Sequence, residues 1–222
     1  MKKEWCIPKV GAEFVWRMED VLDLYAEPLD SKKPVVCFDE RPCQLMGDVV
    51  APVPTKPARV RKQDYEYKRK GNCNLFVMVE PLGGWRNVEV TDRRTSIDFA
   101  HQMKALVDEH YPRAEVIRIV LDNLSSHTPA ALHQAFPPEG ARRLTRKLEF
   151  HYTPKHGSWL NMAEIEISVL ARQCLRRRIA DKDTLRQEIA PWQANRNRQQ
   201  ATIQWNFSTA DARTKLNRLY PS

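Results

Sequence analysis

The alternation of apolar and polar stretches divides the chain into strands and helices. Short apolar runs bounded by turn residues predict five strands, over residues 35–39, 74–80, 85–91, 116–121 and 148–152. Apolar positions that recur at the helical period predict helices over residues 13–25, 96–111, 128–136, 141–147, 159–178, 183–198 and 209–219. A further short strand is expected over residues 44–50.

The order of these elements predicts a mixed sheet. Two apolar runs flank Pro81-Leu82-Gly83-Gly84, and such runs around a Gly-Gly turn are typical of a β-hairpin. The later strand–helix–strand units favour parallel pairs. The predicted fold is therefore α/β, with a mixed five-stranded sheet and helices on both faces. We expect one domain over residues 35–222 and a helical lead-in over residues 1–34.

Acidic residues end two of the apolar runs. Asp39 follows the first strand and Asp122 follows the fourth. If these strands are parallel neighbours, both carboxylates lie at the same edge of the sheet, which suits Mg²⁺ or Mn²⁺. Taken singly, an acid at a strand end more often belongs to a turn, and a helical Glu is usually solvated.

A third acid is expected from the helix over residues 159–178. Glu164 and Glu166 lie on opposite flanks of its apolar stripe, and either flank can face the sheet edge. Asn161 lies on the side of Glu164, one turn earlier, which favours Glu164 as the third member of the cluster.

The charge balance favours an anionic partner. The chain of 222 residues carries a formal net charge of +8, so nucleic acid is the first expectation, an acidic membrane surface the second, and a merely basic protein the plain alternative. Three prolines exclude regular structure from residues 51–62. Lysines and arginines gather in two segments of the chain, where they either face solvent or contact phosphates. The first segment contains Lys56, Arg59, Arg61, Lys62, Lys68, Arg69 and Lys70, and the second contains Arg172 and Arg176.

The remaining composition sets limits on other classes of protein. No apolar stretch approaches the roughly 20 residues that cross a bilayer, and the first residues do not resemble a signal peptide. The five cysteines are an odd number without a CxxC pair. This pattern argues against a zinc site and against a disulfide scaffold, and we expect a reducing cytosol.

The acid-bearing segments together resemble DDE transposases, and within them the mariner-like superfamily and its bacterial insertion-sequence relatives. The matching segments are Phe38-Asp39-Glu40, then Leu121-Asp122-Asn123-Leu124-Ser125-Ser126-His127, then residues 152–164, which end in Trp159-Leu160-Asn161-Met162-Ala163-Glu164. The resemblance extends over most of the chain, and the third segment is its most specific part. Met162 departs from the pattern, because proline stands there in many relatives.

This resemblance implies a ribonuclease-H-like fold and two Mg²⁺ or Mn²⁺ ions. Asp39, Asp122 and Glu164 match the catalytic, metal-binding acids of the family, while Asn123, His127 and Asn161 match their motif neighbours. The implied activity is hydrolysis of phosphodiesters at transposon ends, followed by joining of 3′-hydroxyls to target DNA. The implied partners are double-stranded DNA and a second copy of the chain, in the bacterial cytoplasm with the nucleoid and away from membranes.

Three alternatives remain open at this stage. The chain is a transposase core, a nuclease of similar fold that does not transfer strands, or a DNA-binding remnant without activity. The segment before Asp39 is shorter than the pair of helix-turn-helix modules that relatives carry, so we expect a catalytic domain without them. We expect His127 to be a helix-cap neighbour, although it can also orient another side chain or contact substrate.

Overall fold

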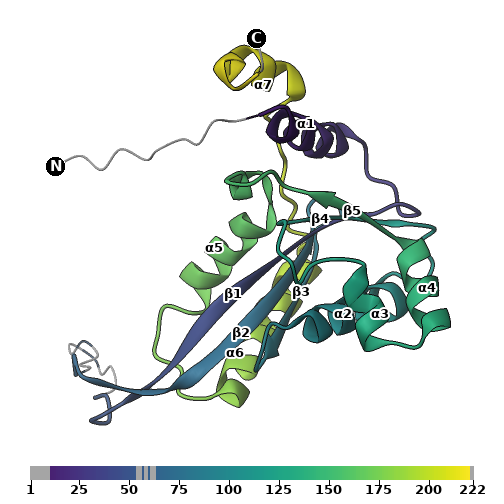
Figure 1. The fold of residues 1–222 in the computed structure, drawn as a ribbon. Coiled ribbons are helices and arrows are strands. Elements are labelled where there is room, and N and C mark those ends of the chain that lie inside the picture. Colours follow the sequence, from purple (N-terminus) through teal and green to yellow (C-terminus); the bar gives the residue numbers. More distant parts are fainter. Residues whose placement is uncertain (1–10, 54–56, 58–59, 61–63, 221–222) are drawn as a thin grey trace.

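A mixed β-sheet forms the centre of the molecule (Figure 1). The computed structural model describes residues 11–53, 57, 60 and 64–220. Within these residues the sheet has five strands in the order β3-β2-β1-β4-β5. The strands are β1 (Val35–Asp48), β2 (Tyr67–Glu80), β3 (Trp85–Thr91), β4 (Ile117–Leu121) and β5 (Leu148–Tyr152).

The pairing confirms the predicted mixture of directions. β1 and β2 are antiparallel, as are β2 and β3, whereas β4 is parallel to both β1 and β5. The β2–β3 hairpin turns at Gly84, whose φ of +68° favours glycine. A Cβ at Gly84 would also lie 2.5 Å from the backbone carbon of Gln200, so the close approach of the two segments excludes a side chain there.

Strands β1 and β2 are longer than predicted. Each has 14 residues, and their outer halves pair with one another from Gln44 and Asn72 to Asp48 and Tyr67. The strand expected over residues 44–50 forms over residues 44–48, where it continues β1. The two outer halves form a two-stranded ribbon that projects from the sheet (Figure 1). Mutual pairing satisfies their backbone groups, although exposed polar residues give this part little strand periodicity.

Helices cover both faces of the sheet, as predicted. The α-helices are α1 (Ala12–Ala26), α2 (Ser96–Ala105), α3 (Ala130–Ala135), α4 (Pro138–Lys147), α5 (Ala163–Gln173), α6 (Lys182–Arg198) and α7 (Thr209–Lys215). Helices α2, α3 and α4 lie on one face, and α1, α5, α6 and α7 lie on the other (Figure 1). Among the described residues, no helix is long and apolar enough to span a membrane.

Several predicted helix boundaries were wrong. The single helix expected over residues 159–178 is a 3-10 turn, Ser158–Leu160, followed by the shorter α5. The helix expected over residues 96–111 ends as α2 at Ala105 and continues as a π-helical turn, Leu106–His110. Thr95 caps α2 through a reciprocal capping box with Asp98.

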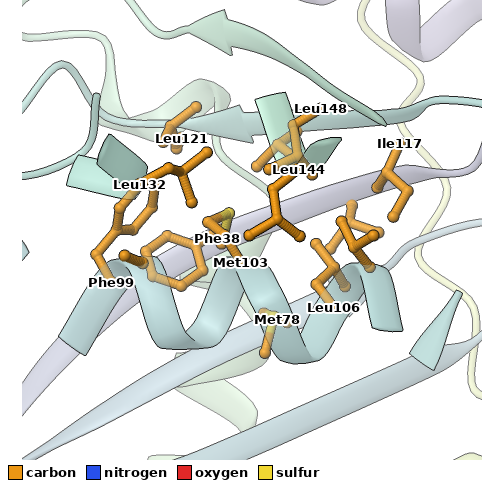
Figure 2. Packing of buried hydrophobic residues seen from close by; sticks show 14 of the residues in the cluster. Phe38, Met78, Phe99, Met103, Leu106, Ile117, Leu121, Leu132, Leu144 and Leu148 are labelled. Carbon is orange, nitrogen blue, oxygen red and sulfur yellow. The ribbon is translucent and has the colours of Figure 1, made fainter. Parts of the chain in front are cut away.

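The core between the sheet and α2 fixes the end of β1. Phe38 stacks on Phe76 and meets Phe99 of α2 edge-on, with ring centroids 5.5 and 5.3 Å apart. Met103 and Leu106 extend the same layer toward Ile117 of β4 (Figure 2). Because successive residues of a strand point to opposite faces, burial of Phe38 in this layer turns Asp39 toward the opposite face, where α5 packs.

Candidate active site

Asp39 lies within β1, which continues to Asp48, and Asp122 directly follows β4, the strand parallel to it. The expectation that Asp39 ends a strand was wrong, because pairing with β2 extends β1 beyond it. The parallel register pairs Val35 with Arg118 and Cys37 with Val120, and Asp39 and Asp122 each lie two residues further along the chain. Asp39 is 9% exposed, and the side chain of Asp122 is 32% exposed. The carboxyl edge of the sheet therefore carries one buried and one accessible carboxylate.

Glu164 reaches the same edge from the first turn of α5, where its side chain is exposed. The turn before it is anchored by Asn161, whose Nδ2 donates to the backbone oxygen of Phe38 at 2.8 Å. The Oδ1 atom of Asn161 accepts from the backbone N–H of Ala163 at 3.1 Å. Asn161 is buried, so these bonds fix the start of α5 against the end of β1.

The pKa of Asp39 is affected by the other acids near it. Burial, together with the negative charges of Glu164, Asp122 and Glu40, raises this pKa to about 7, against the backbone N–H of Glu40, which donates to Oδ1 at 2.7 Å. The charges of Asp122 and Glu164 thus both act on Asp39. Like charges that interact in this way favour a bound cation or a shared proton.

The donor set fits a hard divalent cation. All three side chains offer carboxylate oxygens, which suit Mg²⁺ or Mn²⁺ better than softer metals. Among the described residues, no three His, Cys, Asp or Glu side chains already stand in a geometry that holds an ion. Mutual repulsion keeps uncompensated carboxylates apart, so closer approach requires the positive charge of the ion itself.

His127 joins the site on the other side of Asp122. Its Nδ1 lies 2.6 Å from Asp122 Oδ1, and its Nε2 lies 3.0 Å from Glu40 Oε2. Burial opposes a charge on this ring, but the hydrogen bonds and negative charges of Asp122 and Glu40 outweigh it and raise the pKa of His127 to about 9. His127 lies shortly before α3, as expected of a helix-cap neighbour, and its contact with Asp122 agrees with the alternative that it orients another side chain.

Glu166, the other acid weighed for the cluster, has a structural environment. Its side chain is fully buried, and its carboxylate pairs with Arg86 at 3.1 Å and with Arg196 at 2.6 Å. It therefore faces β3 and α6, away from Asp39. Asn123 is exposed beside Asp122.

Five of the nine basic candidates lie in the part of the chain that the structure describes. Lys68, Arg69 and Lys70 are exposed on the outer half of β2, and Arg172 and Arg176 are exposed at and beyond the end of α5. The other four, Lys56, Arg59, Arg61 and Lys62, lie outside the described residues. Arg178 joins the two regions, because it donates to Asp48 and to the backbone oxygens of residues 64–66.

Comparison with known proteins decides the family. The model of the DDE superfamily endonucleases matches residues 34–186, which contain all three acids. The chain belongs to the DDE superfamily endonuclease family. No curated protein matches the chain. The family and the clustered acids identify the carboxyl edge of the sheet as the candidate site of an endonuclease.

Solved structures of the Mos1 mariner transposase share the fold of this DDE endonuclease. The Mos1 strand transfer complex is 13% identical, with a TM-score of 0.57, over 87% of this chain and 58% of the Mos1 chain. The Mos1 paired end complex with Mn is also 13% identical, with a TM-score of 0.56, over 90% of this chain and 62% of the other. This likeness confirms the ribonuclease-H-like fold. The chain spans about three fifths of the length of these Mos1 chains.

Proposed function

We propose that this DDE endonuclease is the catalytic core of a DNA transposase. In this proposal it hydrolyses phosphodiesters at transposon ends and joins the freed 3′-hydroxyls to target DNA. The observation that carries the proposal is the parallel pairing of β1 and β4 ahead of Asp39 and Asp122, with the charges of Asp122 and Glu164 both acting on Asp39. Residues 35–222 form the catalytic domain in this proposal, and residues 1–34 form a helical lead-in, although residues 1–10 and 221–222 lie outside the described part of the chain.

The three acids are proposed to hold two Mg²⁺ or Mn²⁺ ions. Asp39 and Asp122 contribute from the two strands and Glu164 from the helix turn. When bound, such ions activate a water or a 3′-hydroxyl and stabilise the leaving oxygen in an in-line displacement. The chain itself supplies the fixed geometry, because Asn161 holds the start of α5 and burial keeps bulk water from one side of Asp39.

The proposed partners are transposon-end DNA, target DNA and a second copy of the chain assembled on the DNA. Support comes from the net charge of +8 and from the Mos1 neighbours, which are paired-end and strand transfer complexes. Lys68, Arg69, Lys70, Arg172 and Arg176 are proposed phosphate contacts, together with Lys56, Arg59, Arg61 and Lys62. The proposal places the protein in the bacterial cytoplasm, with the nucleoid.

A nicking and joining assay tests the proposal. Supercoiled plasmid and end-labelled duplexes are incubated with the protein and Mg²⁺ or Mn²⁺, with and without a chelator. We expect metal-dependent nicking and joined products, and loss of both in Asp39→Asn, Asp122→Asn and Glu164→Gln. Glu139→Gln is the matched control, because Glu139 is an exposed acid in the first turn of α4.

The same assay separates the alternatives. Nicking without joined products indicates a nuclease that does not transfer strands. DNA binding that neither metal nor the three substitutions alter, without any cleavage, indicates an inactive remnant and refutes the proposed function.

A further inference from the structure

A chain of side-chain contacts runs behind the candidate site. Arg94 Nη1 donates to Glu40 Oε1 at 3.0 Å, and Glu40 Oε2 lies 3.0 Å from His127 Nε2. The opposite ring nitrogen, Nδ1, lies 2.6 Å from Asp122 Oδ1. The contacts thus cross from the loop before α2, over β1, to the end of β4.

The ring of His127 has little freedom to move. It is fully buried, and both ring nitrogens have a carboxylate partner. Phe99 stacks on it with centroids 4.9 Å apart, and Phe38 meets it edge-on at 5.3 Å. Tyr152 fixes the backbone, because its hydroxyl donates to the carbonyl oxygen of His127 at 2.8 Å. A rotated ring would lose both hydrogen bonds and collide with packed aromatic side chains.

Glu40 is excluded from the metal-binding side by the pleat of β1. Asp39 turns toward α5, so its neighbour Glu40 turns toward α2 and His127. The Glu40 side chain is 5% exposed, and its two oxygens are engaged by Arg94 and His127. A buried carboxylate in this position serves to orient the ring beside it.

We propose that Glu40 and His127 are positioning residues that hold Asp122 for the metal ion. This inference rests on the proposed function. The side chain of Asp122 is one-third exposed at a strand end, where a carboxylate otherwise samples several rotamers. The hydrogen bond from His127 occupies Oδ1 and fixes the direction of Oδ2. Removing such a hydrogen bond behind a metal ligand typically costs about 10- to 100-fold in metal affinity or activity.

The test measures Mn²⁺ affinity without DNA or turnover. Free Mn²⁺ is followed by electron paramagnetic resonance during titration of the full chain, and nicking is measured across the same Mn²⁺ range. We expect His127→Gln to weaken Mn²⁺ binding about 10- to 100-fold. Nicking in this variant should recover in part at high Mn²⁺. Glu40→Gln and Arg94→Ala should show smaller losses of affinity in the same direction, and both keep the buried ring in place.

His151→Gln is the matched control. His151 also lies between two carboxylates, with Nδ1 2.8 Å from Asp20 of α1 and Nε2 3.0 Å from Glu149 of β5, but neither carboxylate is a candidate metal-binding acid. The His151→Gln variant should bind Mn²⁺ with the same affinity as the wild type. Urea unfolding of each variant establishes that it is folded.

The possible outcomes separate the two proposals. If the wild type binds Mn²⁺, and folded His127→Gln and Glu40→Gln bind it with affinities within twofold of the wild type, the positioning role is refuted. The proposed function then still stands. An equal loss in His151→Gln also refutes it, because the effect is then general. A wild-type protein that binds no Mn²⁺ overturns the metal-dependent function, and the positioning role falls with it. If His127→Gln does not fold, Glu40→Gln and Arg94→Ala decide alone.

Discussion

The side-chain amide of Asn161 donates a 2.8 Å hydrogen bond to the backbone carbonyl of Phe38, the residue directly before Asp39. The same amide nitrogen lies 3.5 Å from Asp39 Oδ2. A residue 122 positions later in the chain therefore fixes the part of β1 that carries the first acid. The relative position of Asp39 and Glu164 depends on this one side chain, because Asn161 also begins the turn that leads to Glu164.

Replacing Asn161 by Asp should destabilise the protein. The substitution keeps the size of the side chain but places an acceptor against the Phe38 carbonyl and beside Asp39. We expect the free energy of unfolding at pH 7 to fall by about 1–3 kcal/mol, measured by urea denaturation, together with a loss of nicking. Asn195→Asp on the exposed side of α6 is the control and should change stability by less than about 0.5 kcal/mol. Equal effects of the two substitutions would contradict the anchoring role.

Substitution of Glu166 should reduce stability, whereas substitution of Glu164 should reduce activity. Glu166 neutralises Arg86 and Arg196 in a buried cluster, so Glu166→Ala leaves two guanidinium groups unpaired. We expect a loss of about 3–5 kcal/mol in unfolding free energy. Glu164→Ala removes an exposed side chain and should change stability by less than about 0.5 kcal/mol while abolishing nicking. The reverse pattern, a stable Glu166→Ala and an unstable Glu164→Ala, would show that the two roles are misassigned.

The basic residues of β2 should determine part of the salt dependence of DNA binding. Lys68, Arg69 and Lys70 are exposed on the outer ribbon, where they can follow a phosphate backbone. Replacing all three by Gln should weaken binding to duplex DNA at low salt. The slope of log K against log salt should decrease by up to about 0.9 for each phosphate that the protein no longer neutralises. Fluorescence anisotropy across a salt series measures this slope, and an unchanged slope removes the three residues from the DNA interface.

Cys43 and Cys73 provide a chemical test of the register between β1 and β2. The two residues are directly opposite one another, and both thiols are free. Burial raises the pKa of Cys73 to about 11, and it also raises the pKa of Cys43. At neutral pH both groups are therefore thiols, and oxidation by diamide should be slow, accelerating about tenfold per pH unit toward the pKa.

Peptide mapping under non-reducing conditions should identify a bond between Cys43 and Cys73, and Cys73→Ser should prevent it. A bond from Cys43 to another cysteine, or oxidation that does not depend on pH, would contradict the register or the burial of the pair.

The sequence alone determined the order of the elements and two of their exact ranges. Trp85–Thr91 and Leu148–Tyr152 match the predicted strands, because a Gly-Gly turn begins the first and a helix with a basic end precedes the second. The pairing of Asp39 with Asp122 also followed from local information. Each ends a buried apolar run, and parallel neighbours bring such ends to one edge.

Only the tertiary structure decided which side chains complete the site. Helical spacing left Glu164 and Glu166 on two flanks of one stripe, and packing against Arg86 and Arg196 assigned Glu166 to the core. Nothing in the local sequence indicates that His127 lies between Asp122 and Glu40, since Glu40 is 87 residues away. Periodicity describes which face of an element is apolar, whereas a contact between distant polar groups depends on how those faces pack together.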